Sequence, residues 1–204
     1  CEYLLVDGGK MSKSLGNTYT ISQLKEKGIF PLAYKLFCFT AHYRNQLNFT
    51  FDGAYGAQKA LERLYESYEK HLSNNSKIDT ETMESYRKKF TDAINDDMNM
   101  PQAMSVVWEV ARNESKSIDY AKLLEEFDEV LGLDLKNAPK YLSEFKEYRE
   151  NQIPEEIIEL AEKRKEAREN KDWEKSDELR ENILQKGYNI KDSKEGYSLE
   201  KINK

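Results

Sequence analysis

The sequence is poor in the residues that build metal centres and disulfide frameworks. Its 204 residues include only two cysteines and two histidines. Cys1 and Cys38 lie far apart, and neither belongs to a CxxC or HxxxH pattern, so the spacing predicts no metal site in this chain. Unpaired cysteines fit a reducing compartment. We expect Cys38 to be a buried thiol in a helix core, and we assign no role to Cys1.

The sequence also lacks long apolar runs and an excess of positive charge. No stretch approaches a membrane span or a signal peptide, charged residues make up 34% of the chain and the mean hydropathy is -0.88. These values predict a soluble, cytoplasmic protein with no membrane partner. The net charge of -6 argues against indiscriminate nucleic-acid binding and against DNA. A specific RNA-binding protein is still compatible with it if basic groups gather on one face.

Apolar residues recur every three or four positions through most of the chain, which predicts helices. The first helix opens at Pro31, Asn99 caps the fourth, and Gly132 closes the fifth. Four or five antiparallel helices with short loops favour a mainly α fold built as a bundle. The predicted core rows are Leu32, Leu36, Phe39; Ala57, Leu61, Leu64, Tyr68, Leu72; Met83, Tyr86, Phe90, Ile94; Val106, Val107, Val110; and Tyr120, Leu123, Leu124, Phe127, Val130.

Both ends of the chain depart from this pattern. Residues 3–6 have the composition of a strand, with no partner strand in reach. From Pro154 onward the pattern predicts a helical hairpin, whose second helix is capped by Asp172 and lined by Leu179, Ile183 and Leu184. Two short strands then flank a polar turn at residues 192–196. We expect a small C-terminal unit of a helix hairpin and a β hairpin.

Residues 10–17, Lys-Met-Ser-Lys-Ser-Leu-Gly-Asn, contain two lysines and two serines within five positions, with glycines on both sides. Such a loop presents mobile ammonium groups and several donors, which suits transient capture of a polyphosphate. The GxxxxGK[ST] spacing of a P-loop is absent. A solvated basic turn is the alternative interpretation for lysines of this kind.

The same run matches the KMSKS signature of class I aminoacyl-tRNA synthetases letter for letter. The resemblance implies a loop that closes over ATP while an amino acid is adenylated. Lys13 would stabilise the departing pyrophosphate, and Lys10 would assist.

Three further segments narrow the resemblance. Residues 42–49 resemble the HYRxxLN(Y/F) run of cysteinyl-tRNA synthetases, and residues 96–101 resemble their DDxNxP element. Residues 171–173, with Asp177 and Gly187, resemble their KDWxxAD…G segment. The order and spacing agree over nearly the whole chain. Met100, Ser176 and Leu199 depart from the pattern.

The resemblance implies that the chain is the C-terminal part of a cysteine–tRNA ligase, which would use ATP with Mg, cysteine and cysteine tRNA. Residues 1–30 would then be the end of the catalytic domain, and residues 31–132 a helical bundle that includes a stem-contact helix. Residues 133–153 would be a connector between that bundle and an anticodon-reading unit formed by residues 154–204. No HIGH-type motif is present, and the zinc site of the parent would lie elsewhere. We therefore expect this piece alone to be inactive and to hold no cofactor.

The resemblance also implies that Arg168, Trp173, Asp177 and Asp192 bind tRNA. The cysteine anticodon begins with guanine, whose N–H donors suit a carboxylate, and unpaired bases stack on aromatic rings. Trp173 packing within the hairpin, and aspartates acting as caps or solvated charges, are the alternatives. At the level of the whole chain, the alternatives are a non-catalytic RNA-binding module and a ligase that passes cysteinyl adenylate to a non-tRNA acceptor.

Overall fold

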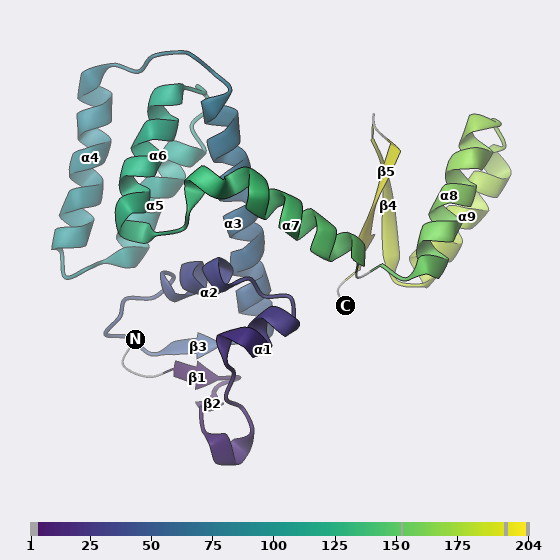
Figure 1. Cartoon of the computed structure of the whole chain (residues 1–204), viewed down its shortest axis with the longest axis horizontal. Helices are drawn as coiled ribbons and strands as arrows, with labels where there is room; N and C mark the ends of the chain where they lie inside the picture. Colours follow the sequence, from purple (N-terminus) through teal and green to yellow (C-terminus); the bar gives the residue numbers. More distant parts are fainter. Residues whose placement is uncertain (1–3, 152, 194–195, 203–204) are drawn as a thin grey trace. The chain divides into compact units, whose positions relative to one another are not determined.

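A computed structural model describes residues 4–151, 153–193 and 196–202. Its fold is mainly α, with one three-stranded sheet and one β hairpin among these residues, as the sequence predicted (Figure 1). The chain divides into two compact units, residues 1–145 and 146–204. Cys1 lies outside the described residues.

Helices dominate the first unit. They are α1 (Ile21–Glu26), α2 (Pro31–Cys38), α3 (Phe51–Leu72), α4 (Thr80–Asn95), α5 (Met100–Ala111) and α6 (Ile118–Leu131), and α7 (Ala138–Asn151) begins there. The predicted boundaries at Pro31, Asn99 and Gly132 are confirmed. Asn99 accepts a hydrogen bond from the Gln102 amide, and Gly132 closes α6 in the left-handed conformation at φ 58°.

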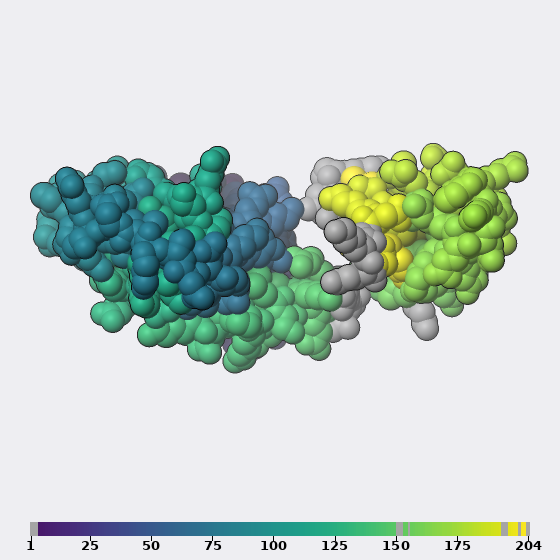
Figure 2. All heavy atoms as spheres, turned by 90° about the horizontal axis from the view of Figure 1, so that it is seen from above, coloured from purple at the N-terminus to yellow at the C-terminus, as the bar shows by residue number. Residues whose placement is uncertain are grey.

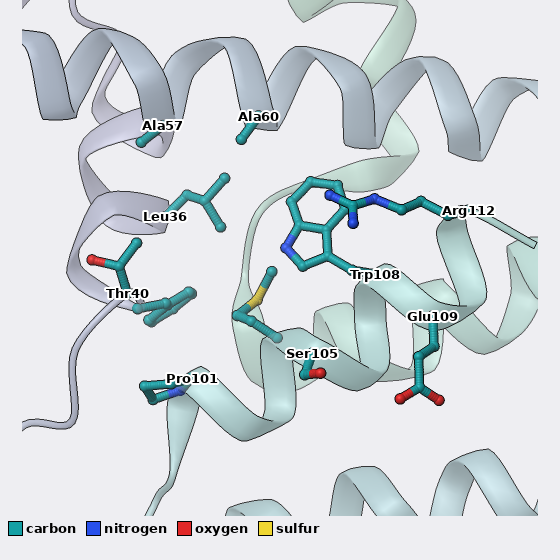
Figure 3. Close-up of a pocket in the computed structure, with 11 residues that line it drawn as sticks. Leu36, Thr40, Ala57, Ala60, Pro101, Ser105, Trp108, Glu109 and Arg112 are labelled. Carbon is teal, nitrogen blue, oxygen red and sulfur yellow. The ribbon is translucent and has the colours of Figure 1, made fainter.

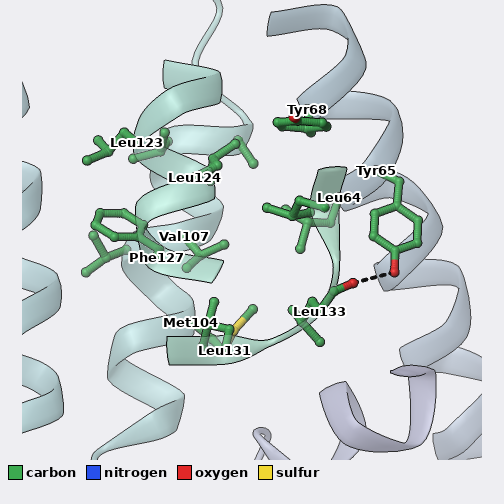
Figure 4. Close-up of a cluster of buried hydrophobic side chains, with 14 of the residues drawn as sticks. Leu64, Tyr65, Tyr68, Met104, Val107, Leu123, Leu124, Phe127, Leu131 and Leu133 are labelled. Atoms are coloured by element: carbon green, nitrogen blue, oxygen red, sulfur yellow. Dashed lines mark hydrogen bonds between the residues drawn. The ribbon is translucent and has the colours of Figure 1, made fainter. Parts of the chain in front are cut away.

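The main core lies between α3, α5 and α6 (Figure 4). Leu64, Val107 and Leu124 are among its fully buried residues, each stabilising the fold by roughly 1.5–3 kcal/mol. The segment expected to be a connector also contributes, because Leu133 is buried and its carbonyl accepts a hydrogen bond of 2.6 Å from the Tyr65 hydroxyl. The prediction that Val130 is a core residue was wrong. It is 54% exposed, since the buried face of α6 continues through Leu131 instead.

A small sheet stands at the start of the first unit, in the order β2 (Gly9–Lys10), β1 (Leu4–Val6), β3 (Leu47–Phe49). The expectation that the strand at residues 3–6 has no partner was wrong. It pairs antiparallel with β2 and parallel with β3. The parallel partner is three residues long and lies about forty positions downstream, so no local pattern indicates it.

The second unit consists of α8 (Glu155–Glu169), α9 (Trp173–Gln185), β4 (Tyr188–Ser193) and β5 (Gly196–Lys201). Figure 2 shows the yellow side chains of the hairpin against those of α8 and α9. The small core contains Ile157, Ala161, Ile183, Tyr188 and Ile190.

Two details of this unit differ from the prediction. Leu184 does not line the core but is 45% exposed, because its neighbour Ile183 occupies the buried face of α9. Asp192 lies within β4, opposite Tyr197, and not in the turn. The strands extend further than the polar composition of residues 192–196 indicated, and residues 194–195 of the expected turn lie outside the described part.

Cys38 ends α2 and is half-buried, not fully buried as expected, and burial raises the pKa of its thiol. None of the helices in the described ranges is long and apolar enough to cross a membrane.

Candidate nucleotide loop and RNA-contact surface

The loop of residues 10–17 is a closed turn with two exposed lysines. It follows β2, and Ser12 caps a short 3-10 helix (Lys13–Leu15) by accepting a hydrogen bond from the Leu15 amide at 3.2 Å. Gly16 ends that helix at φ 66°. Neither Lys10 nor Lys13 forms an ion pair within the described part of the chain, so both ammonium groups are available to an anion.

Asn17 holds the ends of this loop together, a role that sequence reasoning missed. Its side-chain oxygen accepts a hydrogen bond of 2.8 Å from the Ser12 amide, and its amide nitrogen donates to the Lys10 carbonyl at 3.0 Å. The Gly8 amide, at the base of the loop, donates to Asn48 Oδ1 at 2.8 Å. The terminal Asn of the Leu-Gly-Asn run was a signal of this closure, but it was interpreted only as part of the signature.

The His42-Tyr43-Arg44 run, to which the sequence assigned no role, binds Asp97. Arg44 Nε donates to Asp97 Oδ2 at 2.6 Å, and the Tyr43 hydroxyl donates to Oδ1 at 2.7 Å. These hydrogen bonds, from Arg44 first, lower the pKa of Asp97 to about 2. Asp97 and Met98 both lie at φ 53°, a costly conformation for residues other than glycine. The two motifs therefore form one clamp at the α4–α5 junction.

Three of the four predicted tRNA-binding residues lie together in the second unit. The Arg168 guanidinium stands over the Trp173 ring, 5.8 Å from its centroid, and Arg168 Nη1 is 3.4 Å from Asp192 Oδ2. Trp173 is 57% exposed and does not belong to the small core. Asp177 is exposed on α9, one turn beyond Trp173, and no contact joins it to the other three in the part of the chain described.

Arg164 completes this cluster, and sequence reasoning missed it. Its side chain is 2% exposed, and Nη1 and Nη2 donate to the two carboxylate oxygens of Asp192 at 2.7 and 3.1 Å. This contact is the largest cause that lowers the pKa of Asp192. Arg164 stood in a charged run that appeared solvated, and its position one helical turn before Arg168 was the available signal.

Two buried polar atoms of the second unit have no hydrogen-bond partner among the described residues: Arg164 Nε, which belongs to this cluster, and Ser176 Oγ of α9. The cluster itself presents a carboxylate held by Arg164, an exposed indole and an exposed guanidinium close together. That combination suits hydrogen bonding to a donor edge and stacking on a planar group.

Within the described ranges, no group of three or more His, Cys, Asp and Glu side chains is arranged to hold a metal ion.

Comparison with known proteins agrees with these features. Residues 89–136 match the DALR domain family. A cysteine–tRNA ligase of Opitutus terrae is 37% identical over the whole of this chain and 41% of its own length. The enzymes of Burkholderia lata and Chlamydia felis are each 33% identical, over 93% and 98% of this chain and 38% and 44% of theirs.

The chain belongs to the cysteine–tRNA ligase family. It spans about two fifths of the length of these ligases. The family inferred from the four sequence motifs is thereby confirmed. The DALR match covers the end of α4, all of α5 and α6, and the start of the following segment. Of the three helices around the main core, it therefore contains α5 and α6 but not α3.

Proposed function

We propose that this chain is the tRNA-binding part of an enzyme that activates cysteine with ATP and transfers it to cysteine tRNA. The observation that carries the proposal is the cluster of Arg168, Trp173 and Asp192 on one surface of the second unit, with Asp192 fixed by Arg164. The family membership supports it, because the relatives named above are cysteine–tRNA ligases.

The cluster has the chemistry to read an RNA loop. Trp173 offers a face for an unpaired base, and Arg168 contributes a second planar surface or a phosphate contact. Asp192 keeps free lone pairs although Arg164 binds both of its oxygens, since a carboxylate accepts about four hydrogen bonds. With Asp177 one turn along α9, these residues would read the anticodon, and one carboxylate would accept from the first-position guanine.

The loop of residues 10–17 would bind the phosphates of ATP, which would enter with Mg. Lys13 lies on the short 3-10 helix that Ser12 caps. The two hydrogen bonds of the Asn17 side chain, to the Ser12 amide and the Lys10 carbonyl, keep the loop compact. A charge held there would stabilise the pyrophosphate as it leaves, an interaction strongest in the transition state. Zinc, if the parent enzyme uses it for the cysteine thiol, would bind elsewhere.

The test is binding of cysteine tRNA to the 204-residue chain, alongside the same tRNA with its first anticodon base changed. Trp173→Ala should weaken binding by about 1–3 kcal/mol through lost stacking. Leu184→Ala, which truncates another exposed apolar side chain of the same helix, is the matched control and should bind normally. Equal affinity of the unaltered chain for both tRNAs would refute anticodon reading.

Asp177→Asn tests which of the two aspartates, Asp177 or Asp192, accepts hydrogen bonds from the first anticodon base. It replaces an acceptor oxygen with a donor amide, so binding should fall for cysteine tRNA and the preference for guanine should relax. Glu178→Gln, the exposed neighbour on the same helix, is its control. If only Asp192→Asn changes the preference, Asp192 alone reads the base.

A further inference from the structure

A hollow of about 590 Å³ opens on the helical bundle between α2, α3 and α5 (Figure 3). Its volume lies within the roughly 300–1,000 Å³ typical of ligand pockets. Leu36 and Ala57 form part of an apolar wall, and Trp108 projects from α5 into the hollow. The Arg112 guanidinium stands beside the indole, 4.9 Å from the ring centroid. The indole N–H has no hydrogen-bond partner within the part of the chain described.

A second hollow, of about 240 Å³, shares Trp108 and Arg112 with the first and adds Arg63 and Lys70 of α3. We call these four residues and the two hollows the Trp108 groove. Lys70 also lines a neighbouring depression together with Lys116. Two acidic residues also lie here. Glu66 lines the second hollow and the neighbouring depression. Glu109 lines the larger hollow and forms an ion pair with Lys89, with Nζ and Oε2 3.2 Å apart.

The cations of the Trp108 groove differ from those of the nearby helix α4. On α4, Arg87, Lys88 and Lys89 each form an ion pair. In the groove, no ion pair with a described residue is made by Arg63, Lys70 or Arg112. The pKa of Lys116 is lowered, first by burial of its own amine and second by the positive charge of Lys70. These two amines therefore lie close enough to repel each other. A chain of net charge -6 thus places three cations that form no ion pair with a described residue beside a half-buried indole.

We propose that the Trp108 groove is a second RNA site, in which an unpaired nucleobase enters the larger hollow against Trp108 and the flanking phosphates contact Arg63, Lys70 and Arg112. The inference rests on the proposed function, since it places a further part of the same tRNA on the bundle. Charge complementarity favours RNA, because phosphates would neutralise the unpaired cations. The apolar wall and the free indole N–H favour a planar group with an acceptor on its edge.

The decisive measurement is the affinity of the 204-residue chain for cysteine tRNA over a range of salt concentrations. Each phosphate contact contributes about 0.7 to 0.9 to the slope of log affinity against log salt. Arg112→Ala should reduce that slope by about this amount and weaken binding several-fold. Lys88→Ala removes an exposed, ion-paired lysine of α4 and should change neither quantity.

Trp108→Ala should weaken binding about tenfold and leave the salt slope unchanged, whereas Trp108→Phe, which keeps a ring, should weaken it less. In a Trp173→Phe chain, Trp108 is the sole tryptophan, and its fluorescence should fall when cysteine tRNA binds. Thermal melting accompanies each variant. If Trp108→Ala unfolds the bundle, the Arg112→Ala variant, which removes an exposed side chain, still tests the site through its salt slope.

These measurements distinguish failure of tRNA binding as a whole from failure of the Trp108 groove alone. If the unaltered chain does not bind cysteine tRNA, both fail. If it binds in an anticodon-dependent way while Arg112→Ala and Trp108→Ala keep the full affinity and slope, only the Trp108 groove is wrong. If the chain forms a dimer that Trp108→Ala dissociates, and tRNA does not compete with that dimer, the groove joins two copies and the inference is overturned.

Discussion

Replacing Asp192 with alanine should destabilise the second unit more than replacing its partner Arg164 with methionine. Arg164 is 2% exposed, so Asp192→Ala leaves a buried guanidinium without a counter-charge. Asp192 is 44% exposed, so Arg164→Met leaves a carboxylate that water and Arg168 still solvate. The asymmetry follows from burial alone, because both substitutions remove the same ion pair.

The size of the effect follows from the same geometry. Removing one partner of a fully buried pair costs about 3–5 kcal/mol. Water reaches the Asp192 end of this pair and screens it, so we discount the cost to about 2 kcal/mol for Asp192→Ala. For a unit of this size, that loss lowers the melting temperature by roughly 8–16 °C. Arg164→Met should cost about half as much, since the aliphatic replacement fills the same space.

The assay follows unfolding of the second unit through Trp173 in a Trp108→Phe chain, where Trp173 is the sole tryptophan. Combining Arg164→Met with Asp192→Asn should cost less than the sum of the two single changes, because the buried charge is then absent. Because the pKa of Asp192 is lowered on folding, the stabilisation is present above its unfolded pKa near 4 and is lost as pH falls below it. A second unit that melts normally with Asp192→Ala at neutral pH would refute this reasoning.

Substitutions at two positions, Lys13 and Asp97, test the first unit, and Lys25 supplies a control. In the full-length enzyme, Lys13→Ala should slow cysteine-dependent ATP–pyrophosphate exchange about a hundredfold, on the order of 3 kcal/mol, with little change in ATP affinity. Lys25→Ala on α1 is the control, and a rate within twofold of the unaltered enzyme would exclude Lys13 from this role. Asp97→Ala should lower the melting temperature of the bundle more than Asp97→Gly, because glycine tolerates φ 53°. As the pKa of Asp97 is about 2 when folded, its contribution should persist above pH 4 and disappear near pH 2; equal melting of the two variants would mean that the backbone there is unstrained.

The bundle was predictable from sequence because its signals are local. An apolar residue every turn, a capping Asn99 and a terminal Gly132 specify where helices lie without knowledge of their neighbours. The sheet was not predictable in the same way, since the pairing of β1 with β3 joins segments about forty positions apart. Val130 and Leu184 show the remaining ambiguity. Each is adjacent to another apolar residue, Leu131 or Ile183, that occupies the buried face of its helix, and the periodicity alone does not decide which of the two neighbours is buried.

The residues of the candidate site were also predictable only in part. Arg168, Trp173, Asp177 and Asp192 came from motif resemblance, and the structure joins three of them. Arg164 was missed because composition cannot distinguish a buried arginine from its solvated neighbours in a charged run. Its burial depends on β4, a strand that follows 24 residues after it, carrying Asp192 to its guanidinium. The clamp between Arg44 and Asp97 was missed because its two residues are 53 positions apart in the sequence and only the fold brings them together.

The parallel pairing of β1 with β3 also bears on how the chain acquires its fold during synthesis. β2 follows β1 by only a few residues, so the partner on that edge of β1 is translated almost at once. Among the described residues, the partner on the other edge of β1 is Leu47–Phe49, which is translated about forty positions later. At about 5–20 residues per second, the delay is on the order of two to nine seconds. During that interval α1 and α2 emerge, and β1 presents an open strand edge that other nascent chains could pair with.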